Sequence, residues 1–148
     1  MDIEDLLIMW SRDSKIDEVD LDASSIASAC LHSKYLEIYS AAKLGLKRKE
    51  LRLAELKRDL WLYYNGKMSK EEMDERGWTY DPYKGLSKPL KSDMGMYYDS
   101  DPYMMKYKLE VEESQVLVDT CKEIMDNIRW RHQNIKNIIT WRQFQSGV

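Results

Sequence analysis

The chain has 148 residues, of which 43% are hydrophobic and 33% are charged, and its formal net charge is −3. This composition is typical of a soluble globular or coiled-coil protein and excludes an intrinsically disordered chain. No apolar run approaches the roughly 18 to 20 residues that a membrane-spanning helix needs. The acidic N-terminus also lacks the basic start and cleavage site of a signal peptide. We therefore expect a single domain, residues 1–148, that stays in the cytoplasm without contacting a membrane.

The charges are distributed unevenly along the chain. Residues 1–24 carry two basic residues against eight carboxylates, a balance of −6. Residues 43–58 carry seven basic residues against two carboxylates, a balance of +5, and residues 127–148 carry four basic residues and no acidic one. This asymmetry indicates contact with a polyanion at particular places on the surface.

Residues 1–22 form an acidic N-terminal arm, in which we expect a short amphipathic helix over about residues 2–12. The expected apolar side of this helix consists of Leu6, Leu7 and Trp10. A turn-rich acidic stretch follows, and Asp22 or Ser24 is a suitable N-cap for the next helix.

A long basic helix is predicted over residues 24–65. Apolar residues recur there in steps of three and four, the pattern of helix-on-helix packing, interrupted only by Lys49. The seam consists of Tyr39, Ala42, Leu46, Leu53, Leu56, Leu60 and Tyr63. Asn65–Gly66 suits a left-handed C-terminal cap that would end the helix.

The same helix carries a second apolar line about half a turn away from the seam. It consists of Leu44, Leu51 and Leu62. A helix that is apolar on two sides packs against two neighbours. Because two long helices alone bury little surface, we expect a homo-oligomer.

Residues 66–102 form the connection to the last helix. A small acidic helix, SKEEMDER, is expected in it with Ser69 as the N-cap. Residues 77–102 contain all three prolines and read as a long, irregular, aromatic-rich segment, which in a compact protein is functional or packs on something. Its tyrosines and lysines suit a clasp between subunits better than a nucleic-acid contact.

The last helix is predicted over about residues 103–143, within a C-terminal segment 103–148 that would also mediate oligomerisation. Its seam reads Tyr107, Val111, Ser114, Val118, Cys121, Met125, Ile128, His132, Ile135 and Ile139, widened by Leu117, Ile124 and Ile138. Two helices of about forty residues, joined by a connection that can reverse direction, predict an all-α fold: a long helical hairpin with a short N-terminal helix.

No motif of an enzyme is present: the chain lacks a P-loop, a dinucleotide-binding glycine motif, HExxH and Cys-x-x-Cys. His32 and His132 fall on helical seams, where a packed histidine is expected, and Cys30 and Cys121 read as small buried hydrophobes. The acidic residues of the arm lack the glycine and the spacing of a calcium loop. We expect no catalysis, no cofactor and no metal.

Two groups of basic residues are candidates for nucleic-acid binding. On the long basic helix, Lys43, Lys47, Lys57 and Arg58 fall within about 100° of one another, with Glu50 among them; the alternative is an ordinary solvated face. In the C-terminal segment, IRWRHQNIKNIITWRQF interleaves bases with aromatic residues, which is what single-stranded nucleic acid requires. These bases are Arg129, Arg131, Lys136 and Arg142.

The apolar residues of the C-terminal segment have an alternative role in packing between subunits. The candidates for oligomerisation are Trp130, Ile135, Ile139, Trp141 and Phe144.

The segment HSKYLEIYSAAKLGLKRKELRLAELKRDLWLYYNGK resembles the UvsY family of T-even-like phage recombination mediators. The family shows a Ser-Lys-aromatic-Leu start and a Tyr-Tyr-x-Gly end to its long basic helix, and residues 33–36 and 63–66 match both. NIRWRHQNIKNIITWRQFQSG resembles the family's C-terminal segment, and YYDSDP resembles its usage before the last helix. The resemblance covers roughly residues 1–148.

The resemblance implies a non-enzymatic, ring-like homo-oligomer that binds single-stranded DNA in the cytoplasm of the infected bacterial host. Such a protein helps the phage recombinase displace the single-strand-binding protein and nucleate its filament. Arg58 matches the first basic residue of the family's DNA-binding motif, but Leu60 occupies the position of the second. The alternative is a helical adapter or structural ring that binds only protein, with its bases paired to the acidic arms of neighbouring subunits.

Overall fold

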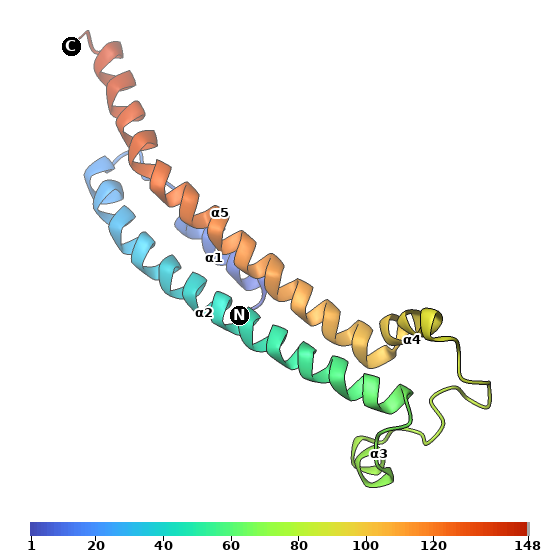
Figure 1. Cartoon of the computed structure of the whole chain (residues 1–148). Coiled ribbons are helices and arrows are strands. Elements are labelled where there is room, and N and C mark those ends of the chain that lie inside the picture. Colours follow the sequence, from blue (N-terminus) through green and yellow to red (C-terminus); the bar gives the residue numbers. More distant parts are fainter. Residues whose placement is uncertain (148) are drawn as a thin grey trace. The chain divides into compact units, whose positions relative to one another are not determined.

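The computed structural model describes residues 1–147, and every regular secondary-structure element in that range is a helix (Figure 1). Two long helices of 44 residues each are accompanied by a short N-terminal helix, which confirms the predicted all-α class. Among the described helices, none is both long and apolar enough to span a membrane. The elements are α1 (Ile3–Asp13), α2 (Leu21–Tyr64), α3 (Lys70–Arg76), the 3₁₀ helix η1 (Lys91–Asp93), α4 (Met94–Ser100) and α5 (Pro102–Gln145).

The chain divides into two compact units. Unit 1 consists of Met1–Leu46 together with the residues from Glu113 onward, and unit 2 consists of Lys47–Glu112. The helices α2 and α5 each contribute one part to unit 1 and one part to unit 2. The expected single domain stays a prediction.

Three helices build the core of unit 1, where α1 lies beside parts of α2 and α5 (Figure 1). The ring of Tyr35 is fully buried and meets Trp10 edge to face, with 5.3 Å between the ring centroids. The inner side of α1 is formed by Leu6, Met9 and Trp10, at the i, i+3, i+4 spacing of one helix face. Leu7, which we expected on this side, is 48% exposed because it lies about 100° round the helix from Leu6.

The start of α2 differs from the prediction. Asp20 caps the helix, because its Oδ1 accepts a hydrogen bond from the Ala23 backbone N–H at 3.0 Å. The expected caps, Asp22 and Ser24, lie within the helix. Ser24 is instead buried, and its hydroxyl accepts a hydrogen bond from the Asp17 backbone N–H at 3.0 Å, which fastens the acidic turn to α2.

In unit 2, α2 ends as predicted. Gly66 has a left-handed backbone (φ 68°), its N–H donates to the Tyr63 carbonyl, and the Lys67 N–H donates to the Leu62 carbonyl. This pair of bonds is a Schellman motif, which glycine adopts without steric cost. The core beside it consists of Leu60, Tyr63, Tyr64, Met68, Tyr83, Met94 and Met104.

The connection is more ordered than its sequence indicated. The helix α3 begins after Ser69, whose hydroxyl accepts from the Glu72 N–H, as expected. The helices η1 and α4 were not predicted. Tyr83 is buried, and its hydroxyl donates to the Tyr64 carbonyl, so this tyrosine of the connection packs on its own α2 and is not available as a clasp between subunits.

The seam of α5 is confirmed in its central part, where Val118, Cys121, Met125 and Ile128 are buried. His132, which we expected to be packed, is exposed. Cys30 is likewise exposed and Cys121 is buried, so only the latter behaves as a small core hydrophobe; both are free thiols.

Candidate nucleic-acid interface

The basic ridge of unit 2 lies on α2 and consists of Lys47, Lys57 and Arg58, all exposed. The leucine seam lies beside the ridge on α2 and faces the core, and Leu60, three residues after Lys57, is only 1% exposed. A basic residue at position 60 would therefore face the interior of unit 2. Leu60 is thus part of the core of unit 2 and cannot act as a phosphate ligand.

Acidic neighbours partly neutralise the ridge. The Lys47 ammonium lies 3.5 Å from the Glu50 carboxylate, and the Arg58 guanidinium lies 3.5 Å from Asp59. Asp59 lies closer to Arg76, whose guanidinium donates a hydrogen bond to the Asp59 carboxylate at 2.8 Å. This bond links α3 to α2. Exposed pairs of this length contribute little to stability, so a phosphate can displace them.

Lys43, the fourth candidate on α2, belongs to unit 1. Its side chain is exposed, and its ammonium lies 5.1 Å from the centre of the Tyr39 ring. Lys43 is therefore described apart from the ridge, which belongs to unit 2.

The C-terminal bases divide into two kinds. Arg129, Lys136 and Arg142 are exposed, and Arg129 lies 3.4 Å from Asp126. Arg131 is only 5% exposed, and its guanidinium donates to the carbonyls of Ser14 and Lys15 at 2.8 and 2.9 Å.

Arg131 therefore holds the segment after α1 against α5. Because its guanidinium is buried in this contact, we no longer count it among the candidate phosphate ligands. Burial lowers the pKa of its guanidinium. The sequence contains a signal for this role, because position 131 continues the spacing of Ile128 and Ile135 in steps of three and four. We had assigned that inner position to His132.

The apolar candidates of the same segment also divide. Ile135 is 3% exposed and packs within its own protomer, so it is not accessible to another subunit. Ile139 and Trp130 are exposed, and Trp141 (59% exposed) stacks on Phe144 (73% exposed) with 5.6 Å between the ring centroids. Aromatic rings exposed to this extent are a common feature of interaction surfaces.

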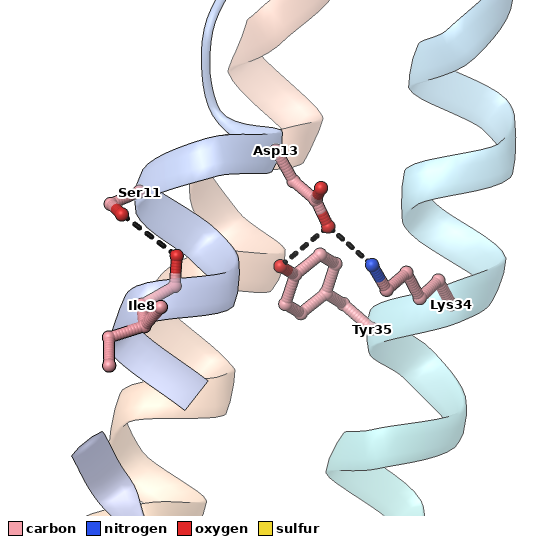
Figure 2. A network of polar contacts seen from close by, with 5 residues as sticks. All are labelled: Ile8, Ser11, Asp13, Lys34 and Tyr35. Atoms are coloured by element: carbon pink, nitrogen blue, oxygen red, sulfur yellow. Dashed lines mark hydrogen bonds and ion pairs between the residues drawn. The ribbon is translucent and has the colours of Figure 1, made fainter. Parts of the chain in front are cut away.

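A polar network fixes the acidic arm on the basic helix (Figure 2). One carboxylate oxygen of Asp13 accepts hydrogen bonds from the Lys34 ammonium at 2.5 Å and from the Tyr35 hydroxyl at 3.0 Å. The bond from Lys34 holds the pKa of Asp13 below its usual range, helped by the bond from Tyr35. Burial raises the pKa of Tyr35. Lys34 is thus engaged in a structural contact.

At the C-terminal end of α2 the structure also shows a pocket of about 460 Å³ that the sequence did not indicate. Trp61, which lines this pocket, follows Lys57 by four residues and Arg58 by three. Residues 1–147 contain no group of three or more His, Cys, Asp or Glu side chains placed to bind a metal ion.

Comparison with known proteins agrees with these features. The model of the family described as recombination, repair and ssDNA binding protein UvsY matches residues 9–148. Recombination protein uvsY of Enterobacteria phage T4 is 26% identical over 147 residues, which are 99% of each chain. A crystal structure of the bacteriophage T4 recombination mediator protein UvsY, lattice type II, superposes with a TM-score of 0.82 at 25% identity and covers 99% of this chain and 98% of that one. Lattice type I gives a TM-score of 0.80 at 24% identity, over 95% and 98%.

Proposed function

Because the chain belongs to the UvsY family of recombination, repair and single-stranded-DNA-binding proteins, we propose that it is a non-enzymatic recombination mediator. It binds single-stranded DNA as a ring-like homo-oligomer and helps load a recombinase onto DNA that is covered by single-strand-binding protein. It acts in the cytoplasm of the infected bacterial host. The recombination mediator UvsY of bacteriophage T4, a close structural neighbour, supports this role.

The observation that carries the proposal is the exposed basic ridge of α2 in a chain whose net charge is −3. On one protomer, the ridge offers about three phosphate contacts, and such binding is weak and falls with salt at a log–log slope of about −0.7 per phosphate on single strands. Repeating the ridge in an oligomer makes each further contact intramolecular, which raises avidity by about 10² to 10⁴. The exposed bases Arg129, Lys136 and Arg142 add to the contacts.

Self-association is supported by apolar side chains that the protomer leaves in solvent. On α2, the second apolar line keeps Leu44 and Leu51 exposed. On α5, Trp130, Trp141 and Phe144 are exposed. Covering these side chains with another subunit would remove apolar surface from water at about 25 cal/mol per Å².

The acidic arm is the proposed surface for protein partners. Asp17, Glu18, Asp20 and Asp22 lie close together in the sequence and are exposed. This charge is opposite to that of the DNA-binding ridge, so the arm repels a nucleic acid and attracts a basic protein surface. The recombinase and the single-strand-binding protein are the partners that a mediator requires.

The ridge is tested by the double variant Lys57→Ala/Arg58→Ala. Fluorescence anisotropy of a labelled oligonucleotide over a salt series should show weaker binding and a slope reduced by about 1.4 per protomer, for two lost phosphate contacts. Light scattering should give an unchanged oligomer mass. The matched control, Lys106→Ala/Lys122→Ala, removes two exposed bases of α5 and should bind as the wild type does.

Two results would contradict the proposal. Wild-type affinity and salt slope in the Lys57→Ala/Arg58→Ala variant would show that the ridge is not the DNA contact. Failure of the wild-type oligomer to bind the oligonucleotide at low salt would favour the protein-only adapter.

A further inference from the structure

The pocket at the end of α2 combines one large aromatic face with basic groups. Its volume of about 460 Å³ lies within the range of small-ligand sites, about 300 to 1,000 Å³. Among residues 1–147, no Asp or Glu side chain lines the pocket. The lining residues are Trp61, Asn65, Lys88, Pro89, Lys91, Met94, Gly95 and Tyr98.

Trp61 leaves 45% of its surface exposed on a helix whose other side is packed, so a face of its ring is accessible to a ligand. The Lys67 ammonium lies 4.7 Å from the centre of its ring. An electron-rich ring next to a cation suits a ligand that presents both a flat π-surface and negative charge.

The amide of Asn65 has a fixed orientation. Its Nδ2 donates to the Trp61 carbonyl at 2.8 Å and to the Tyr98 hydroxyl at 2.9 Å. A carbonyl only accepts, so the nitrogen must be on that side and the amide oxygen is directed away from both partners. An oriented amide oxygen is suited to accept a hydrogen bond from a base.

The basic ridge leads to this pocket. Lys57 and Arg58 precede Trp61 by four and three residues, so the three side chains are neighbours on one face of α2. Lys88 and Lys91 come from the connection and place positive charge at the same pocket. A strand whose phosphates contact the ridge therefore has an aromatic face within reach of its bases.

We propose that this pocket takes one nucleotide of the bound strand, with its base stacked on Trp61 and its phosphates beside Lys88 and Lys91. The inference rests on the proposed function and deepens it by assigning the base contact of the same DNA site. An acidic peptide would use the lysines but would leave the aromatic face and the oriented amide without a partner.

The test compares two oligonucleotides of equal length, oligo(dT) and a fully abasic strand, which present the same number of phosphates. The assembled wild-type protein should bind oligo(dT) more tightly, by about 5- to 150-fold for each pocket that holds a stacked base. Trp61→Leu should remove most of this preference, and Trp61→Phe should restore much of it because a π-face is again present.

The lysines give an independent variant that leaves α2 unchanged. Lys88→Gln/Lys91→Gln should weaken binding of both strands to the same extent and reduce the salt slope. The matched control, Lys84→Gln/Lys106→Gln, removes two bases outside the pocket lining and should leave both affinities as in the wild type. Light scattering and thermal melting check that each variant keeps its assembly and fold.

The outcomes separate this inference from the proposed function. If wild-type protein binds oligo(dT) but Trp61→Leu keeps the full preference over the abasic strand, the pocket proposal is overturned and the DNA-binding role stands. If Lys88→Gln/Lys91→Gln binds both oligonucleotides as the wild type does, and the wild type but not this variant binds a polyglutamate peptide, the pocket is a peptide site. That result overturns the nucleotide proposal. If the wild type binds neither strand, the proposed function itself is wrong.

Discussion

At the scale of single residues, two buried polar groups decide how the N-terminal arm is held. The Tyr35 hydroxyl is buried and has Asp13 as its hydrogen-bond partner. The Arg131 guanidinium is buried against two backbone carbonyls that follow α1. Because an unpaired buried polar group costs about 1 to 3 kcal/mol, the Tyr35 hydroxyl and the two terminal nitrogens of Arg131 stabilise this arrangement of the arm over alternatives that would leave them without partners.

Asp13→Ala should therefore lower the free energy of unfolding by about 1 to 3 kcal/mol, since the Tyr35 hydroxyl loses its acceptor. Asp13→Asn should lower it less, because the amide oxygen can still accept from Tyr35. Urea unfolding at neutral pH measures both. Equal stability of Asp13→Ala and the wild type would show that the network of Figure 2 contributes nothing to the fold.

The same carboxylate adds a pH dependence of known sign. The pKa of Asp13 is lower in the folded chain than in the unfolded one, so its stabilising contribution is complete above the unfolded pKa of about 4 and is lost as the pH falls below it. The difference in stability between the wild type and Asp13→Asn should therefore be larger at pH 7 than at pH 3. A constant difference would contradict the lowered pKa.

At the scale of elements, one aspartate connects the two long helices within unit 2. The Oδ1 of Asp101 accepts from the backbone N–H groups of Tyr103 and Met104 at 2.9 and 3.3 Å, and thereby caps α5. Its Oδ2 accepts from the Tyr64 hydroxyl, at the end of α2, at 2.8 Å. Pro102 follows as the first residue of α5, where its fixed φ suits the helix and its missing N–H costs nothing.

Asp101→Ala should destabilise the protein by about 2 to 4 kcal/mol, because it removes a helix cap and leaves the buried Tyr64 hydroxyl without its acceptor. Hydrogen exchange should show faster exchange of the Tyr103 and Met104 amides. Asp101→Asn is the matched control, since asparagine also caps helices. If Asp101→Ala left these amides as protected as in the wild type, the cap would not hold the start of α5.

At the scale of the whole molecule, assembly converts weak contacts into firm binding. Trp141→Ala/Phe144→Ala removes the stacked, exposed pair on α5 while leaving the ridge of α2 unchanged. We expect a lower oligomer mass by light scattering and a loss of DNA affinity of about 10² to 10⁴ at equal protomer concentration.

The control for this double variant removes apolar groups that are as exposed but lie outside α5. Val19→Ala/Leu86→Ala meets that condition and should leave the mass and the affinity as in the wild type. A Trp141→Ala/Phe144→Ala protein that is monomeric yet binds an oligonucleotide as tightly as the wild type would show that avidity is not the source of affinity.

The elements that could be predicted from sequence are those that local interactions specify. Seam spacing located the two long helices, Ser69 located the start of α3, and Gly66 located the end of α2, because caps and helix faces involve residues only a few positions apart. The all-α class follows from the same patterns. The exposed part of the ridge could also be predicted, since Lys57 and Arg58 flank a recognisable seam.

Only the tertiary structure decided which individual polar and aromatic side chains are buried and which residues they contact. Arg131 continues the seam spacing of Ile128 and Ile135, but only the structure shows its partners, the carbonyls of Ser14 and Lys15, which lie more than a hundred residues away in the chain. Trp61 became a candidate base contact only when the connection brought Lys88 and Lys91 to it. Burial and pocket formation depend on which distant segments meet, and periodicity along one helix does not contain that information.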